Sequence, residues 1–234
     1  MKVSAIFLGV GLALAAGTAH AAVIYNTSTS GTAPNVGANA IGYSVQSGGG
    51  PMAESFYTSQ AVTLNSVSLE LSATTNDDGG VTSIYLVANT GGGTGIAGAP
   101  TYTGSGASLA FTNSVLLGTI SNLSLSSSAT TASLSLSKSI TAGEYWIAAV
   151  TSSGSSTQWW YAGNGTGIGT LNQAGFDQYG GPNYNLPETF PVTAGGYEMI
   201  VSATPSAVPE PASLAVIGVA LAGLGMVRRR RRSV

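Results

Sequence analysis

The chain has 234 residues, no cysteine and one histidine, and only 7% of its residues are charged. His20 lies in the N-terminal leader described next, so the rest of the chain cannot form Ser-His-Asp or Cys-His catalytic groups, thiolate or imidazole zinc sites, or disulfides. Between residues 22 and 208, one lysine (Lys138) stands against eight acids, a net charge of −7 (1 − 8). A domain with a single cation cannot neutralise a row of phosphates, which excludes nucleic acid as a partner.

Residues 1–21 have the pattern of a secretory signal peptide. Lys2 supplies a positive start, and Ile6 to Ala16 form a short apolar run. Ala19 and Ala21 satisfy the A-x-A rule, so we predict cleavage before Ala22 and export of the remainder. An uncleaved anchor fits less well, because the apolar run is short and ends in a small-residue site.

Residues 22–205 are expected to form one β-rich domain. Val67 to Ser72 alternates apolar and polar residues, which predicts a strand with Val67, Leu69 and Leu71 in the core and Glu70 in solvent. Ser133 to Ser137 repeats this pattern, as do Leu123 and Leu125 between serines. No window shows a helical stripe.

Two further segments, Val81 to Ala88 and Glu144 to Val150, are more apolar throughout, as expected of central strands covered on both faces. Tyr197 to Val201 is predicted to be the closing strand. Short strands near Ile41, Phe56, Leu116 and Trp159 bring the total to roughly nine to eleven, which favours an all-β antiparallel sandwich, jelly-roll-like or immunoglobulin-like.

Three motifs in this domain have ordinary explanations. Gly93 to Gly98 matches G-x-G-x-x-G, but neither the helix nor the acid that a dinucleotide site needs follows it. Asp77-Asp78 could contribute to a calcium site, but the EF-hand spacing is missing and a hairpin turn is favoured. Leu186 to Phe190 nearly spells the sortase motif, with Phe190 in place of the glycine. We therefore expect no metal and no cofactor.

Gln158-Trp159-Trp160-Tyr161 is the segment best suited to binding. In a strand, Trp159 and Tyr161 share one face and Trp160 takes the other. One face should pack in the core, and the other could stack on a sugar ring, with Asn164, Asn172, Tyr179, Asn183 and Tyr184 as possible neighbours. Core packing alone is the alternative.

Carboxylate pairs are the one catalytic chemistry that the composition leaves open. A glycosidase needs two carboxyl groups about 5–10 Å apart, one of them with a raised pKa. Glu144, Asp177 and Glu188 are available, but their spacing does not single out a pair, and we expect structural or solvated acids.

The C-terminal residues 206–234 have a three-part order. Val208-Pro209-Glu210-Pro211 should be extended, because proline lacks an N–H and disfavours helix in the residue before it. Ala212 to Val227 is apolar or small, and five arginines follow: Arg228, Arg229, Arg230, Arg231 and Arg232. Sixteen helical residues reach ~24 Å, short of the ~30 Å hydrocarbon core, and the arginines can hold that end at the cytoplasmic interface. We expect a marginal, removable transmembrane anchor; a buried core helix is the alternative.

This order resembles the PEP-CTERM sorting signal of Gram-negative bacteria. The resemblance rests on Val208 to Leu214, the Gly/Ala/Leu-rich segment and the arginine cluster. It implies recognition of Pro209, Glu210 and Pro211 by an exosortase, removal of the tail, and release or attachment of the body at the cell surface. The segments 62–71, 84–86 and 143–147 also loosely resemble the β-rich choice-of-anchor bodies found ahead of such tails.

From the sequence we therefore expect an exported surface or matrix protein, associated with exopolysaccharide or biofilm and without catalysis of its own. Its expected partners are the exosortase, the membrane through the tail, and exopolysaccharide. A carbohydrate-binding module centred on Trp159 to Tyr161 is the second hypothesis, and a glycan hydrolase built on acids alone is the third.

Overall fold

The computed structural model describes residues 20–27, 38–42, 50–73, 80–89, 100, 102–103, 110–152, 155–162, 168–170, 173–177, 188–191, 196–206 and 218. Most of the leader, the segments that carry Asp77-Asp78 and Gly93 to Gly98, and the tail from residue 207 apart from Gly218 lie outside these ranges. In the part described, no helix is both long and apolar enough to cross a membrane.

The first of two antiparallel sheets is built around the long strand β4. Five strands follow the order β1-β14-β4-β11-β2, in which β14 and β11 pair with successive parts of one edge of β4. The sixth strand, β9, pairs with the opposite edge of β4. Their bounds are β1 Ala22–Asn26, β2 Ala38–Ala40, β4 Val62–Ala73, β9 Thr130–Ile140, β11 Thr157–Trp160 and β14 Met199–Pro205.

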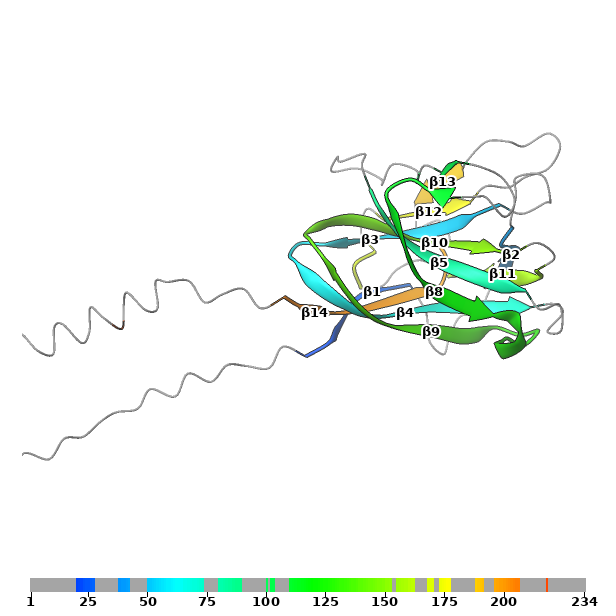
Figure 1. The fold of residues 1–234 in the computed structure, drawn as a ribbon, viewed down its shortest axis with the longest axis horizontal. Coiled ribbons are helices and arrows are strands. Elements are labelled where there is room, and N and C mark those ends of the chain that lie inside the picture. Colours follow the sequence, from blue (N-terminus) through cyan, green and yellow to red (C-terminus); the bar gives the residue numbers. More distant parts are fainter. Residues whose placement is uncertain are drawn as a thin grey trace, which may run out of the picture.

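The second sheet has the order β13-β12-β3-β10-β5-β8 and faces the first (Figure 1). Its strands are β3 Met52–Thr58, β5 Val81–Ala88, β8 Ser114–Ser121, β10 Gly143–Thr151, β12 Ala174–Asp177 and β13 Glu188–Pro191. A two-stranded hairpin, β6 Tyr102–Thr103 with β7 Ala110–Phe111, lies between β5 and β8 in the chain. The predicted all-β antiparallel class is confirmed.

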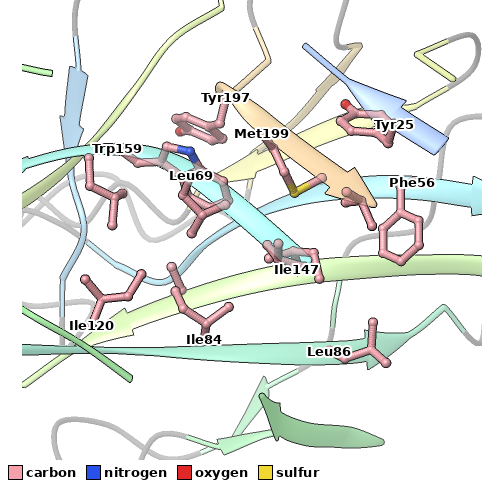
Figure 2. Close-up of a cluster of buried hydrophobic side chains, with 14 of the residues drawn as sticks. Tyr25, Phe56, Leu69, Ile84, Leu86, Ile120, Ile147, Trp159, Tyr197 and Met199 are labelled. Atoms are coloured by element: carbon pink, nitrogen blue, oxygen red, sulfur yellow. The ribbon is translucent and has the colours of Figure 1, made fainter. Parts of the chain in front are cut away.

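Large side chains from both sheets fill the space between them (Figure 2). Leu69, Trp159 and Met199 extend from the first sheet and meet Ile84 and Ile147 from the second. The alternation read from the sequence decides which residues these are, because successive side chains of a strand point to opposite faces. Val67, Leu69 and Leu71 are buried as predicted, and Glu70 lies on the other face of β4.

The outer face of the second sheet is also covered, as its uninterrupted apolar strands predicted. Trp146, Ala148 and Val150 of β10 form a second buried cluster, which includes Phe111 of β7. The ring of Phe111 lies 5.9 Å from that of Tyr85 of β5, so the hairpin β6–β7 contributes to this cover.

Three details of the predicted pattern were wrong. The alternation around Leu123 and Leu125 belongs to a short 3-10 helix, Asn122–Ser124, and buries Leu125 beside it. The strands on either side of Asn76 to Gly80, β4 and β5, lie in different sheets and so do not form the predicted hairpin. The closing strand begins two residues later than predicted, at Met199, and continues to Pro205.

The first and last strands pair with each other, with Ala22 opposite Ala203. The end of the sandwich where β1 begins and β14 finishes is called the exit end below (Figure 1). It also includes Thr58, Val62 and Gly143, the terminal residues of neighbouring strands. The body is therefore joined to its leader and its tail at the same end.

Candidate functional site

The aromatic segment in β11 is divided between the two faces of the first sheet. Trp159 is completely buried, and its ring stacks on Tyr197 at a centroid distance of 5.0 Å. Tyr161 stacks on the same Tyr197 at 5.2 Å. The indole Nε1–H of Trp159 donates to the carbonyl of Glu198 at 2.9 Å. The ring of Trp159 therefore belongs to the core and is not available to a ligand, whereas Tyr161 is half-buried and packs against the core.

Trp160 is the aromatic residue of this segment that lies on the outer face of the first sheet, the face turned away from the second sheet. It is half-buried, and its Nε1–H donates to Ser72 Oγ at 3.0 Å. The Ser72 hydroxyl is buried and donates to Gln158 Oε1 at 3.4 Å. The ring is therefore held in place through its one polar atom, and Gln158 lies beside it. The predicted neighbours Asn164, Asn172, Tyr179, Asn183 and Tyr184 lie outside the described residues.

Two carboxylates are also brought together on this outer face. The Glu70 amide donates to the Glu198 carbonyl at 3.2 Å, although the two residues are far apart in sequence. Burial, followed by the nearby negative charge of Glu70, raises the pKa of Glu198 to about 7. Thr131 Oγ1 donates to Glu70 Oε2 at 2.8 Å. Glu198 is itself buried, so the half-buried Glu70 is the carboxylate of the pair that can accept a hydrogen bond from a ligand hydroxyl.

Hydroxyl groups cover much of the same face beyond these residues. Ser68 and Ser133 hydrogen-bond across β4 and β9 at 2.7 Å, and Thr204 of β14 donates to Asn65 at 2.8 Å. One end of this hydroxyl-covered face holds Glu70, Glu198, Gln158, Ser72 and Trp160. We refer to these five residues as the outer-face patch.

The acids that sequence reasoning considered for catalysis do not form one site. Asp177 and Glu188 occupy paired positions of β12 and β13, but Glu144 lies at the exit end, opposite Tyr57. Burial raises the pKa of Glu144, although Asn89 Nδ2–H donates to its carboxylate at 2.7 Å and opposes this. Among the residues the structure describes, no group of three or more His, Cys, Asp or Glu side chains could hold a metal ion.

Glu54 is an acid that sequence reasoning missed. It is completely buried on the core face of β3, where the Tyr25 hydroxyl and the Tyr197 backbone amide donate to its carboxylate, the latter at 3.1 Å. Burial raises the pKa of Glu54 to about 8 despite these bonds. The pKa of Tyr25 is also raised, first by burial and then by Glu54. This network connects β1, β3 and Tyr197. All three of its residues are completely buried, so they cannot contact an external ligand.

The C-terminal segment begins where the last strand finishes. β14 ends at Pro205, and the Ser206 amide donates to the Ala61 carbonyl at 3.0 Å. Residues 207–232 match the family described as the PEP-CTERM protein-sorting motif. The tail is a PEP-CTERM sorting motif. Such a motif implies export of the chain, recognition by an exosortase, and membrane association of the tail before display at the surface.

Searches for relatives of the whole chain gave no support beyond this motif. No curated protein matches the chain, and no solved structure matches its fold. The PEP-CTERM motif covers the tail alone, so the role of the body has to be argued from its own residues.

Proposed function

We propose that this protein is exported by a Gram-negative bacterium, processed by an exosortase, and retained at the cell surface or in the exopolysaccharide matrix, where its β-sandwich acts without catalysis of its own. The observation that carries the proposal is the PEP-CTERM motif at residues 207–232, which begins directly after Ser206, a residue hydrogen-bonded to the body. The absence of cysteine and histidine from residues 22–205 agrees with a non-catalytic role.

The sorting step can be tested with matched Pro-Glu substitutions. We expect Pro209→Ala/Glu210→Ala to keep the tail, so that the precursor accumulates in the membrane fraction and surface protein falls by an order of magnitude or more. Intact mass of the protein from each cell fraction reports the cut. The control, Pro187→Ala/Glu188→Ala, changes the same dipeptide in the near-sortase motif and should be processed normally. Normal processing of the first variant would contradict the proposal.

The outer-face patch favours carbohydrate binding as a second candidate function. The patch contains the groups that bind a sugar by stacking and hydrogen bonding. They are an aromatic ring held by Ser72, an adjacent amide and two acids, beside a hydroxyl-covered face. Any such ligand would be neutral or cationic rather than anionic, because the Glu70 carboxylate would repel a negative charge.

Loss of the Trp160 ring should then weaken glycan binding. We expect Trp160→Ala to cost about 1.4 kcal/mol, roughly tenfold in Kd, because an aromatic stacking contact has this magnitude. Binding to the exopolysaccharide of the producing strain, measured by pull-down and titration, provides the readout. Tyr57→Ala removes an exposed aromatic ring remote from the patch and should bind normally. Equal affinity of the two variants would rule out the patch. Glycan turnover that Glu198→Gln abolishes would instead favour a hydrolase.

A further inference from the structure

The exit end differs from the rest of the body in the side chains that it exposes. We infer that this end is a membrane-contact surface: before the tail is cut, the body stands on the bilayer with the exit end against the lipid headgroups. This inference rests on the proposed membrane association of the tail, and adds how the body is oriented and which residues touch lipid.

The connection between body and tail is short. Ser206 is hydrogen-bonded to Ala61 in the turn between β3 and β4, and the apolar run begins at Ala212. Six residues span at most about 20 Å when fully extended, since each adds ~3.5 Å. The twelve-residue strand β4 runs away from this end and is itself about 40 Å long at ~3.3 Å per residue. An anchored tail therefore keeps the exit end near the bilayer and the opposite end far from it.

Exposed apolar side chains gather at this end. Of the five large hydrophobic residues that the described part of the chain exposes, Val23, Tyr57, Val115 and Leu116 lie within three residues of a strand terminus at the exit end. The fifth, Ile168, lies beside Asn26 at the other end of β1. Such residues are costly in water but favourable at a lipid interface, where tyrosine is also enriched.

An open recess of about 320 Å³ adds to this apolar surface. Its walls include Ala22, Ile24, Tyr57, Val62 and Pro205, from the first strand, the last strand and the turn between β3 and β4. The recess lies where the chain leaves the body toward the membrane. The polar residues Thr58, Ser59 and Gln60 also line it, so the recess can receive the glycerol and ester groups of a lipid as well as an acyl chain.

The positions of Lys138 and of the described acids also favour this orientation. Lys138, the one basic residue of the body, lies two residues from the exit end of β9. Its half-buried stem can reach the interface by snorkelling. Four described acids lie toward the opposite end, namely Glu70, Asp177, Glu188 and Glu198, whereas Glu54 is buried in the core and Glu144 lies at the exit end. Lys138 offsets Glu144 at the exit end, so an anionic bilayer surface repels the opposite end more strongly than the exit end.

A lipid surface explains the distribution better than a protein partner. The four apolar side chains come from β1, β3 and β8, and Lys138 comes from β9, so they surround the end of the sandwich on both sheets. A protein interface usually concentrates its apolar residues in one central patch. A flat bilayer can contact side chains all around this end of the sandwich.

The absence of cysteine allows a direct test with single labels. Full-length chains carrying Ser59→Cys or Ser127→Cys are labelled with a polarity-sensitive fluorophore and inserted into vesicles of phosphatidylethanolamine and phosphatidylglycerol. Both serines are exposed, Ser59 at the exit end and Ser127 at the opposite end. Lipids spin-labelled at the headgroup should quench the label at residue 59 several-fold more strongly than that at residue 127. Equal quenching would overturn the inference.

Apolar variants identify the contacts themselves. Tyr57→Ser/Leu116→Ser should lose most of the quenching at residue 59, and Ile168→Ser, an equally exposed apolar side chain elsewhere, should keep it. Unchanged quenching in the double variant would overturn the assignment of these residues. Vesicle flotation of each chain separates the two hypotheses: a chain that fails to float contradicts membrane association of the tail, whereas a chain that floats without quenching at residue 59 contradicts the contact surface alone.

Discussion

Trp159→Ala is expected to remove a large part of the stability of the folded body. Trp159 is completely buried, stacks on Tyr197 and donates its indole N–H to the Glu198 carbonyl. Large aromatic-to-alanine changes in a core cost about 3–5 kcal/mol, and whole domains are stable by only about 5–15 kcal/mol. With no cysteine there is no disulfide to limit the loss. We expect the midpoint of denaturant unfolding to fall steeply, or the variant to be degraded during export.

Two variants separate packing from surface effects. Trp160→Ala, one residue away on the outer face, should cost only about 1–2 kcal/mol, the range for a half-buried side chain and one hydrogen bond. Trp159→Phe keeps a ring against Tyr197 but loses the N–H donor, so its stability should lie between the two. Similar losses for Trp159→Ala and Trp160→Ala would mean that the division of these residues between core and outer face is wrong.

This pair also illustrates how far the sequence can predict the fold. Period-two alternation correctly places Trp159 and Trp160 on opposite faces, and β4 and β9 follow their alternating patterns. Unbroken apolar runs correctly predict that β5 and β10 are covered on both faces. These are local consequences of side chains that alternate along a strand.

Pairing between distant strands could not be predicted in this way. Glu70 and Glu198 become neighbours because β4 pairs with β14, a register that depends on packing of the whole sheet. The same limit explains the wrong hairpin at Asn76 to Gly80, since whether β5 joins β4 depends on partners elsewhere in the chain.

Glu54 did have a local signal, which was overlooked. Met52, Glu54 and Phe56 are alternate residues of β3, so the two apolar residues predict that the acid between them faces the core. This signal is weak for an acid, because acids are seldom fully buried unless they are paired or hydrogen-bonded. The partners that permit its burial, Tyr25 and the Tyr197 amide, come from strands at opposite ends of the chain.

Burial of Glu54 leads to the second large prediction: the body should lose stability as the pH rises. The folded pKa of Glu54 is about 8, above the ordinary glutamate value of 4.5, because burial disfavours the charged form. The folded state therefore binds the proton more tightly than the unfolded state. Its contribution to stability is complete below the unfolded pKa and is lost as the pH rises through 8. Over the two pH units below the folded pKa, at about 1.4 kcal/mol per unit, the loss is about 3 kcal/mol.

Thermal unfolding of the body at pH values from about 6 to 9 provides the measurement. Residues 22–205 contain no histidine, so no imidazole titrates in this window. Glu198, with its pKa raised to about 7, should act in the same direction but at lower pH.

Glu54→Gln provides the decisive comparison, because it keeps the shape of the side chain and its carbonyl acceptor but cannot ionise. We expect this variant to match the parent at pH 6 within about 1–2 kcal/mol, the cost of altering one buried hydrogen bond, and to be the more stable protein at pH 9. Glu198→Gln serves as the matched control and should leave the loss near pH 8 in place.

A parent protein whose stability is flat or rises from pH 6 to pH 9 would show that Glu54 is ionised in the folded core. In that case the two donors, Tyr25 and the Tyr197 amide, would outweigh the cost of removing the carboxylate from water, and the buried group would hold β1 in the sheet through charged hydrogen bonds instead of neutral ones.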